Sequence, residues 1–180
     1  MKKIISAIMM CMILIFAEKS FAAMQFNYQA NVQNYGWLKS VQNGGIAGTT
    51  GKSLRMEAIL INLMDGSKNM IKYCGHVQNL GWQGWQISGG VVGTVGQNLR
   101  LEAVMIKLVN GYDKKFDIYY RTHVENGGWL GWAKNGEPAG TQGASLRLEA
   151  LQIQLVPKGT KFNREGKAFY LKDNYAGASM

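Results

Sequence analysis

The feature that most restricts the fold of this chain is a threefold internal repeat. Three windows of 36 residues, at 28–63, 73–108 and 120–155, align without a gap, and fifteen of their columns are identical in all three. The window starts lie 45 and 47 residues apart, so each repeat unit spans about 45 residues. A unit of that size has too little apolar surface to fold alone, and the three copies must therefore share one core.

Within each copy the apolar residues recur with a period of two rather than 3.6. Tyr28, Ala30 and Val32 alternate with polar residues, and the same alternation starts again at Tyr73 and Tyr120. This period indicates half-buried strands, and the glycine-rich stretches between them are turn signals. We therefore predict an all-β fold in which three tandem repeats close around a pseudo-threefold axis. The pattern does not choose between a β-prism and a β-trefoil.

The last strand of each copy changes its parity. Leu148 and Ala150 share one parity, whereas Leu151 and Ile153 share the other. The same change recurs at two further places, Ala58/Ile59 and Ala103/Val104. A parity change at one position in every copy indicates a β-bulge, or a strand that passes from one sheet environment to another. The alternative is a strand buried on both faces.

The first 22 residues have the pattern of a secretory signal peptide. Two lysines follow the initiating methionine, residues 4–17 are almost wholly apolar, and small residues at 20 and 22 precede the expected cleavage after Ala22. The apolar run of about 14 residues is shorter than the roughly 20 needed to cross a bilayer. We expect an extracellular protein, free or associated with the cell surface, with no transmembrane segment after cleavage.

The mature chain divides into one domain and a tail. Residues 23–156 form the predicted single domain of three repeats, and residues 157–180 form a basic C-terminal tail. The tail segment Phe169-Tyr170-Leu171 either adds a strand or belongs to a flexible basic arm. Cleavage leaves Cys74 as a lone thiol, so no internal disulfide is expected.

The repeated motifs resemble a known family. The string HVQNLGWQGW at 76–85, and GTQG at 140–143 followed by LRLEA at 146–150, resemble the clostridial hydrophobic repeat, called ChW for its characteristic tryptophan. The resemblance covers all three windows. It implies an extracellular or surface module of Gram-positive bacteria that binds polysaccharide or a partner protein.

The first copy departs from this pattern at two positions. Asn31 stands where the other copies have histidine, and Ser40 stands where they have a second tryptophan. A site built from those residues is therefore expected to be weak or absent in the first copy.

Tryptophan supplies the candidate binding residues. Trp82 and Trp85 lie three residues apart, which on a continuous strand places them on opposite faces. The first tryptophan of each copy is then the better core candidate and the second the better ligand platform, because an indole face stacks well on a sugar ring. The alternative role for the neighbouring polar residues is to order the turn. The candidate ligand-binding residues are His76, Gln78, Trp82, Trp85, His123, Trp129 and Trp132.

Opposite charges two residues apart recur in every copy and favour structural ion pairs. With Trp37, the expected structural residues are Arg55 and Glu57, Arg100 and Glu102, and Arg147 and Glu149. Each arginine would keep its neighbouring carboxylate ionised, and exact repetition does not give the two unlike carboxylates that glycoside hydrolysis needs. The sequence contains no nucleophile, phosphate-loop or dinucleotide signature, and it predicts neither a cofactor nor a metal site.

These observations favour a secreted, non-catalytic module that binds polysaccharide or cell-wall polymer. The alternative is a protein-interaction or adhesion module that holds a surface protein. A small hydrolase would rest on Glu102 and Glu149 alone. The formal net charge of +9 is not concentrated within the repeats, and export argues against nucleic acid as a partner.

Overall fold

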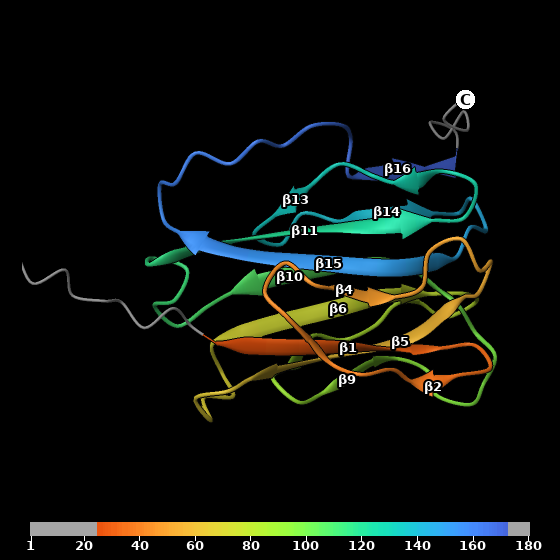
Figure 1. Ribbon diagram of the computed structural model, residues 1–180, viewed down its shortest axis with the longest axis horizontal. Coiled ribbons are helices and arrows are strands. Elements are labelled where there is room, and N and C mark those ends of the chain that lie inside the picture. The colour runs from red at the N-terminus through yellow and green to blue at the C-terminus, as the bar shows by residue number, and fades with distance from the viewer. Residues whose placement is uncertain (1–24, 173–180) are drawn as a thin grey trace, which may run out of the picture.

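The structure is a computed structural model that describes residues 25–172 (Figure 1). The predicted signal peptide, residues 1–22, and the last residues of the tail lie outside this range. The described part contains sixteen β-strands arranged in three sheets, with roughly one sheet for each repeat. The prediction of an all-β fold is confirmed.

Each repeat forms five strands in the same order, namely a long strand, two strands of two residues, a short strand and a second long strand. The first repeat forms β1 (Phe26–Val32), β2 (Gly36–Trp37), β3 (Val41–Gln42), β4 (Ile46–Gly48) and β5 (Met56–Leu63). The second forms β6 (Ile71–Val77), β7 (Gly81–Trp82), β8 (Gln86–Ile87), β9 (Val91–Gly93) and β10 (Leu101–Leu108). The third forms β11 (Phe116–Val124), β12 (Gly128–Trp129), β13 (Ala133–Lys134), β14 (Ala139–Gln142) and β15 (Leu148–Pro157).

The two long strands of each repeat pair with each other, but the fourth strand leaves for another repeat. β9 pairs with β5, β14 pairs with β10, and β4 pairs with β15, all antiparallel. Each sheet is thus completed by a strand from a different repeat, and the first and third repeats are joined directly.

Buried tyrosines at the start of each repeat strengthen these connections. Tyr28 and Tyr73 are fully buried, and their hydroxyls accept hydrogen bonds from the backbone N–H groups of Ile153, at 2.9 Å, and Ile61, at 3.1 Å. Each tyrosine therefore bonds to a strand of another repeat. Burial raises the pKa of both hydroxyls to about 12, so they remain protonated and able to donate at neutral pH.

The parity change in each last strand is a β-bulge. Along β1 and β5 the pairing passes from Asn31 with Ala58 to Val32 with Met56, which leaves Glu57 as the extra residue. The same shift leaves Glu102 and Glu149 as the extra residues in the other two sheets. All three glutamates are only 5% exposed. The repeated glutamate is therefore the bulged residue itself, one position before the parity change visible in the sequence.

The tail returns to the domain. In Figure 1 the segment between β15 and β16 (Phe169–Leu171) arches over the top of the view. β16 then pairs parallel to β14, with Phe169 opposite Gly140, and extends the sheet of the second repeat. Of the two alternatives for this segment, the structure forms the strand.

Candidate functional site

The outer face of each sheet, which is the face turned away from the buried tyrosines, carries most of the predicted site residues. In the second repeat Tyr73 and Val77 point into the core, so Lys72, Cys74 and His76 alternate onto the outer face. The equivalent strand of the third repeat presents Tyr119, Arg121 and His123 in the same way. The bulged glutamate of each sheet lies beside the residue paired at the bulge, which is Asn31, His76 or His123.

The repeated arginines and glutamates form ion pairs in every copy. The distances from Arg Nη2 to Glu Oε1 are 2.7, 2.8 and 2.8 Å in the first, second and third repeats. In each case the arginine Nε also donates to the same oxygen, so one guanidinium edge holds one carboxylate oxygen. The predicted ion pairs are therefore present in all three copies, and each joins an arginine to a glutamate that is 5% exposed.

The second oxygen of the bulged glutamate faces a histidine in two of the three copies. His76 Nδ1 lies 3.0 Å from Glu102 Oε2, and His123 Nδ1 lies 3.1 Å from Glu149 Oε2. Neither contact has the alignment of a hydrogen bond. Each histidine ring also meets the first tryptophan of its repeat edge to face, with centroids 5.5 Å apart. The predicted histidines therefore connect the glutamate to Trp82 and Trp129 in an Arg–Glu–His–Trp chain.

The expectation that the first tryptophan of each copy belongs to the core is wrong. Trp37 is 37% exposed, and Trp82 and Trp129 are half-buried. The reason lies in the strand register, because Trp82 pairs directly opposite His76, and residues that are directly opposed share one face of a sheet. Since His76 faces outward, so does the tryptophan. Its indole Nε1 donates to Gln142 Oε1 at 3.1 Å, a contact that joins the second and third repeats.

The two tryptophans of a copy do not lie on opposite faces either. In the third repeat the guanidinium of Arg121 lies 4.8 Å from the ring centre of Trp129 and 4.7 Å from that of Trp132. β12 ends at Trp129, so the chain between the two tryptophans is not a strand and the alternation of strand side chains does not apply to it. Both rings consequently lie on the outer face.

The second tryptophan is open in the second repeat and covered in the third. Trp85 is 40% exposed, with Lys107 Nζ 4.2 Å from its ring centre. Trp132 is half-buried because Phe162 of the tail meets it edge to face at 5.2 Å. The same phenyl ring stacks on Tyr119 at 3.9 Å with an interplanar angle of 8°.

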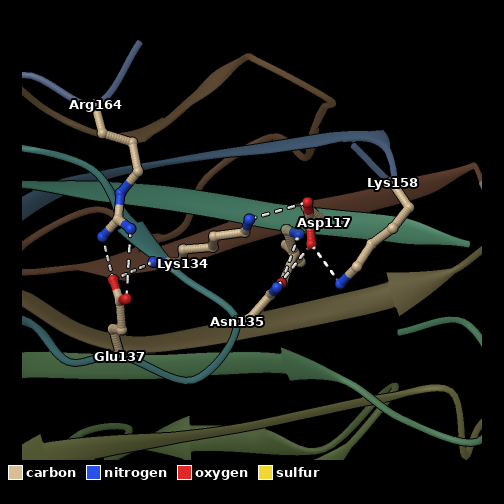
Figure 2. Close-up of polar contacts among 7 residues, drawn as sticks. Asp117, Lys134, Asn135, Glu137, Lys158 and Arg164 are labelled. Atoms are coloured by element: carbon tan, nitrogen blue, oxygen red, sulfur yellow. Dashed lines mark hydrogen bonds and ion pairs between the residues drawn. The ribbon is translucent and has the colours of Figure 1, made fainter. Parts of the chain in front are cut away.

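Charged residues of the tail fasten it over the third repeat (Figure 2). Arg164 donates to the carbonyl oxygen of Trp132 at 3.0 Å and pairs with Glu137. Lys158 donates at 2.7 Å to Asp117, a carboxylate that also accepts from Asn135 and pairs with Lys134. Burial raises the pKa of Asp117, but the hydrogen bonds from Lys158, Asn135 and Lys134 outweigh burial and lower it to about 2.

Gln78, the remaining predicted site residue, lies away from the exposed tryptophan. It lines a hollow of about 200 Å³ together with residues from all three repeats. The other lining residues are Gln33, Arg55, Asn98, Arg100, Glu125 and Arg147. This hollow gathers the three repeated arginines, whereas Trp85 belongs to the outer face of one sheet.

Sequence reasoning missed the residues that distinguish one outer face from another. Lys107, Arg121 and Phe162 contact the tryptophan rings, yet none of them is repeated in the three copies. Lys107 and Arg121 could have been found by comparing the residue types of the three copies at strand positions that face outward, because these positions differ between copies. Phe162 lies outside the repeats and carries no signal in the sequence.

The geometry describes a repeat protein with three sheets completed by strand exchange and with tryptophans on their outer faces. Residues 31–65, 76–110 and 123–157 match the family described as Clostridial hydrophobic W. The match covers more than half of the chain, so the protein belongs to this family, ChW, as its motifs predicted. The chain matches no curated protein and no solved structure. Between residues 25 and 172 no helix has the length and apolar character to span a membrane.

Proposed function

We propose that this ChW protein is a secreted, non-catalytic module that binds an extracellular or cell-surface polysaccharide on the outer face of the second repeat. The exposure of Trp85 carries the proposal. A tryptophan that is 40% exposed presents a flat apolar surface suited to the apolar side of a sugar ring. Its counterpart in the first repeat is Ser40, and its counterpart in the third is covered by the tail, so one site per chain is expected.

The repeated carboxylates support a binding role over a hydrolytic one. Glu102 and Glu149 are 5% exposed and each is held between an arginine and a histidine. The two occupy equivalent environments, whereas glycosidases need one acid and one base or nucleophile with different surroundings. The family match carries no catalytic assignment.

We also propose that the three sheets are arranged around a pseudo-threefold axis, as in a β-prism. The cyclic exchange of β4, β9 and β14 supports this arrangement, because each repeat gives one strand to another repeat and receives one. The convergence of the three repeated arginines on one hollow also supports it. In such an arrangement the three outer faces point in three directions, and each can present its own site.

Protein interaction is the second candidate, and one observation favours it. The tryptophan platform of the third repeat is occupied by a polypeptide, with Phe162 against the ring of Trp132 and Arg164 on its carbonyl oxygen. A surface protein could present a similar segment to the open platform. This alternative predicts a discrete partner in crosslinked culture fractions, and finding none while sugars bind would contradict it.

Affinity electrophoresis through gels containing bacterial wall polysaccharide tests the proposal. We expect Trp85→Ala to weaken retention about thirtyfold, the usual effect of truncating a central tryptophan. Trp37→Ala is the matched control, because that ring is similarly exposed but lies in the repeat that has Ser40. Unchanged retention of the Trp85→Ala variant would exclude this platform as the polysaccharide site.

A further inference from the structure

Two lysines face each other on the outer face of the second repeat. Lys72 on β6 and Lys107 on β10 are directly paired in the antiparallel register. Opposed residues of this kind have Cβ atoms about 5 Å apart, and like charges at that spacing destabilise a sheet. Neither ammonium group forms an ion pair with a carboxylate of residues 25–172. The fold therefore tolerates a repulsion that it does not neutralise.

The repeat architecture does not require this lysine pair. The equivalent opposed residues are Asn27 and Asn62 in the first repeat, and Tyr119 and Gln154 in the third. None of the four is a lysine or an arginine, and they occupy the same register in sheets of the same design. The two lysines are thus particular to the sheet that carries the open tryptophan.

The lysine pair and the tryptophan belong to one surface. Lys107 Nζ lies 4.2 Å from the ring centre of Trp85. Lys72 of β6 is paired with Ile87 of β8, two residues after Trp85, and Ile87 is 36% exposed. An apolar platform and two cations consequently border the same part of the outer face.

The third repeat shows that this part of the face accommodates a ring. There Phe162 stacks on Tyr119, the counterpart of Lys72, and meets the edge of Trp132, the counterpart of Trp85. A six-membered ring at the same place in the second repeat would lie beside the tryptophan and within reach of both ammonium groups. Among residues 25–172 no aromatic ring packs on Trp85, which is 40% exposed.

We propose that the outer face of the second repeat binds a sugar residue that carries an anionic group, with Trp85 against the sugar ring and Lys72 and Lys107 on the anion. This proposal rests on the polysaccharide-binding function above and specifies its ligand as acidic. An anion between the two ammonium groups adds two attractions that outweigh their mutual repulsion, and this explains why the site contains two opposed lysines. A carboxylate, a sulfate and a phosphate share this chemistry.

The test compares polymers that have one backbone with and without charge. The probes are polygalacturonate and its full methyl ester, dextran sulfate and dextran, and a phosphorylated dextran, each measured by affinity electrophoresis on the full mature chain. The variant is Lys72→Gln/Lys107→Gln. The matched control is Lys39→Gln/Lys114→Gln, which removes the same charge from exposed lysines elsewhere. The three charged arms distinguish carboxylate, sulfate and phosphate.

We expect at least one acidic polymer to bind more tightly than its neutral form. For that polymer, Lys72→Gln/Lys107→Gln should lose at least about tenfold in affinity, as expected for lost charge-assisted hydrogen bonds, and the control should lose little. Equal losses in the variant and the control would overturn the proposal, because general charge attraction would then explain binding. Equal binding of charged and neutral polymers, with both lost in Trp85→Ala, would overturn it and leave the polysaccharide function standing. Failure of every polymer would contradict both.

Discussion

Replacing Gly93 by alanine tests whether strand exchange between repeats depends on a close backbone approach. A Cβ atom at Gly93 would lie 2.2 Å from the carbonyl oxygen of Glu57 and 2.7 Å from Cα of Ala58, both on β5 of the preceding repeat. These are backbone atoms of the bulge and cannot rotate away. The residue also has φ +100°, a region that only glycine occupies without strain. Gly48 and Gly140 make the equivalent approaches in the other two sheets.

The added methyl group should force β9 away from β5. That movement would break the 2.9 Å hydrogen bond from the N–H of Thr94 to the carbonyl of Glu57. Backbone strain, overpacking and the lost bond together should lower the free energy of unfolding by about 4 kcal/mol. Gly96→Ala is the control, because its φ is +71° but no atom lies within 4 Å of the added Cβ. It should cost only about 1 kcal/mol.

Urea unfolding of the mature chain, followed by tryptophan fluorescence, measures both variants. The difference between them measures the close approach together with the greater backbone strain at φ +100° than at φ +71°. If Gly93→Ala and Gly96→Ala lost the same stability, the contact between β9 and the bulge would not be the reason for the repeated glycine.

Three further predictions concern the tail and the buried groups. The pKa of Asp117 is lowered to about 2 in the folded state, below its unfolded value near 4. Its stabilising contribution is therefore complete above pH 4 and is lost as the pH falls through 2. Asp117→Asn should reduce the dependence of the free energy of unfolding on pH between pH 4 and 2. A steep limb unchanged in that variant would assign acid unfolding to other carboxylates. Burial raises the pKa of the Cys74 thiol to about 11, so a thiol reagent at pH 8 should label the native chain only at the rate of unfolding, and rapid labelling would contradict the buried position. Phe162→Ala removes the ring that stacks on Tyr119 and covers Trp132. It should speed limited proteolysis between residues 158 and 168 and increase the quenching of tryptophan fluorescence by iodide. The control Asn163→Ala, which changes an exposed neighbour, should do neither.

The sequence by itself determined the features that repeat at fixed spacing. Strand period, turn glycines and the pairing of Arg100 with Glu102 all depend on neighbours within about ten residues. The parity change also indicated the place of the bulge to within one residue, although the pairing of β6 with β10 was needed to distinguish it from a strand buried on both faces. Such features follow from local backbone geometry, and three copies of each signal reinforce one another. The same reasoning failed at Trp82, which it assigned to the core, because it assumed one continuous strand where β7 ends at Trp82 and did not foresee that Trp82 pairs opposite the outward-facing His76.

Only the tertiary structure decided which repeat receives each exchanged strand and which tryptophan remains open. Trp85 and Trp132 occupy the same column of the repeat, yet Phe162, thirty residues after the second of them, covers one and leaves the other exposed. The opposition of Lys72 and Lys107 likewise joins residues 35 positions apart through the register of two strands. Contacts of this kind depend on the path of the whole chain, and so no local pattern in the sequence carries them.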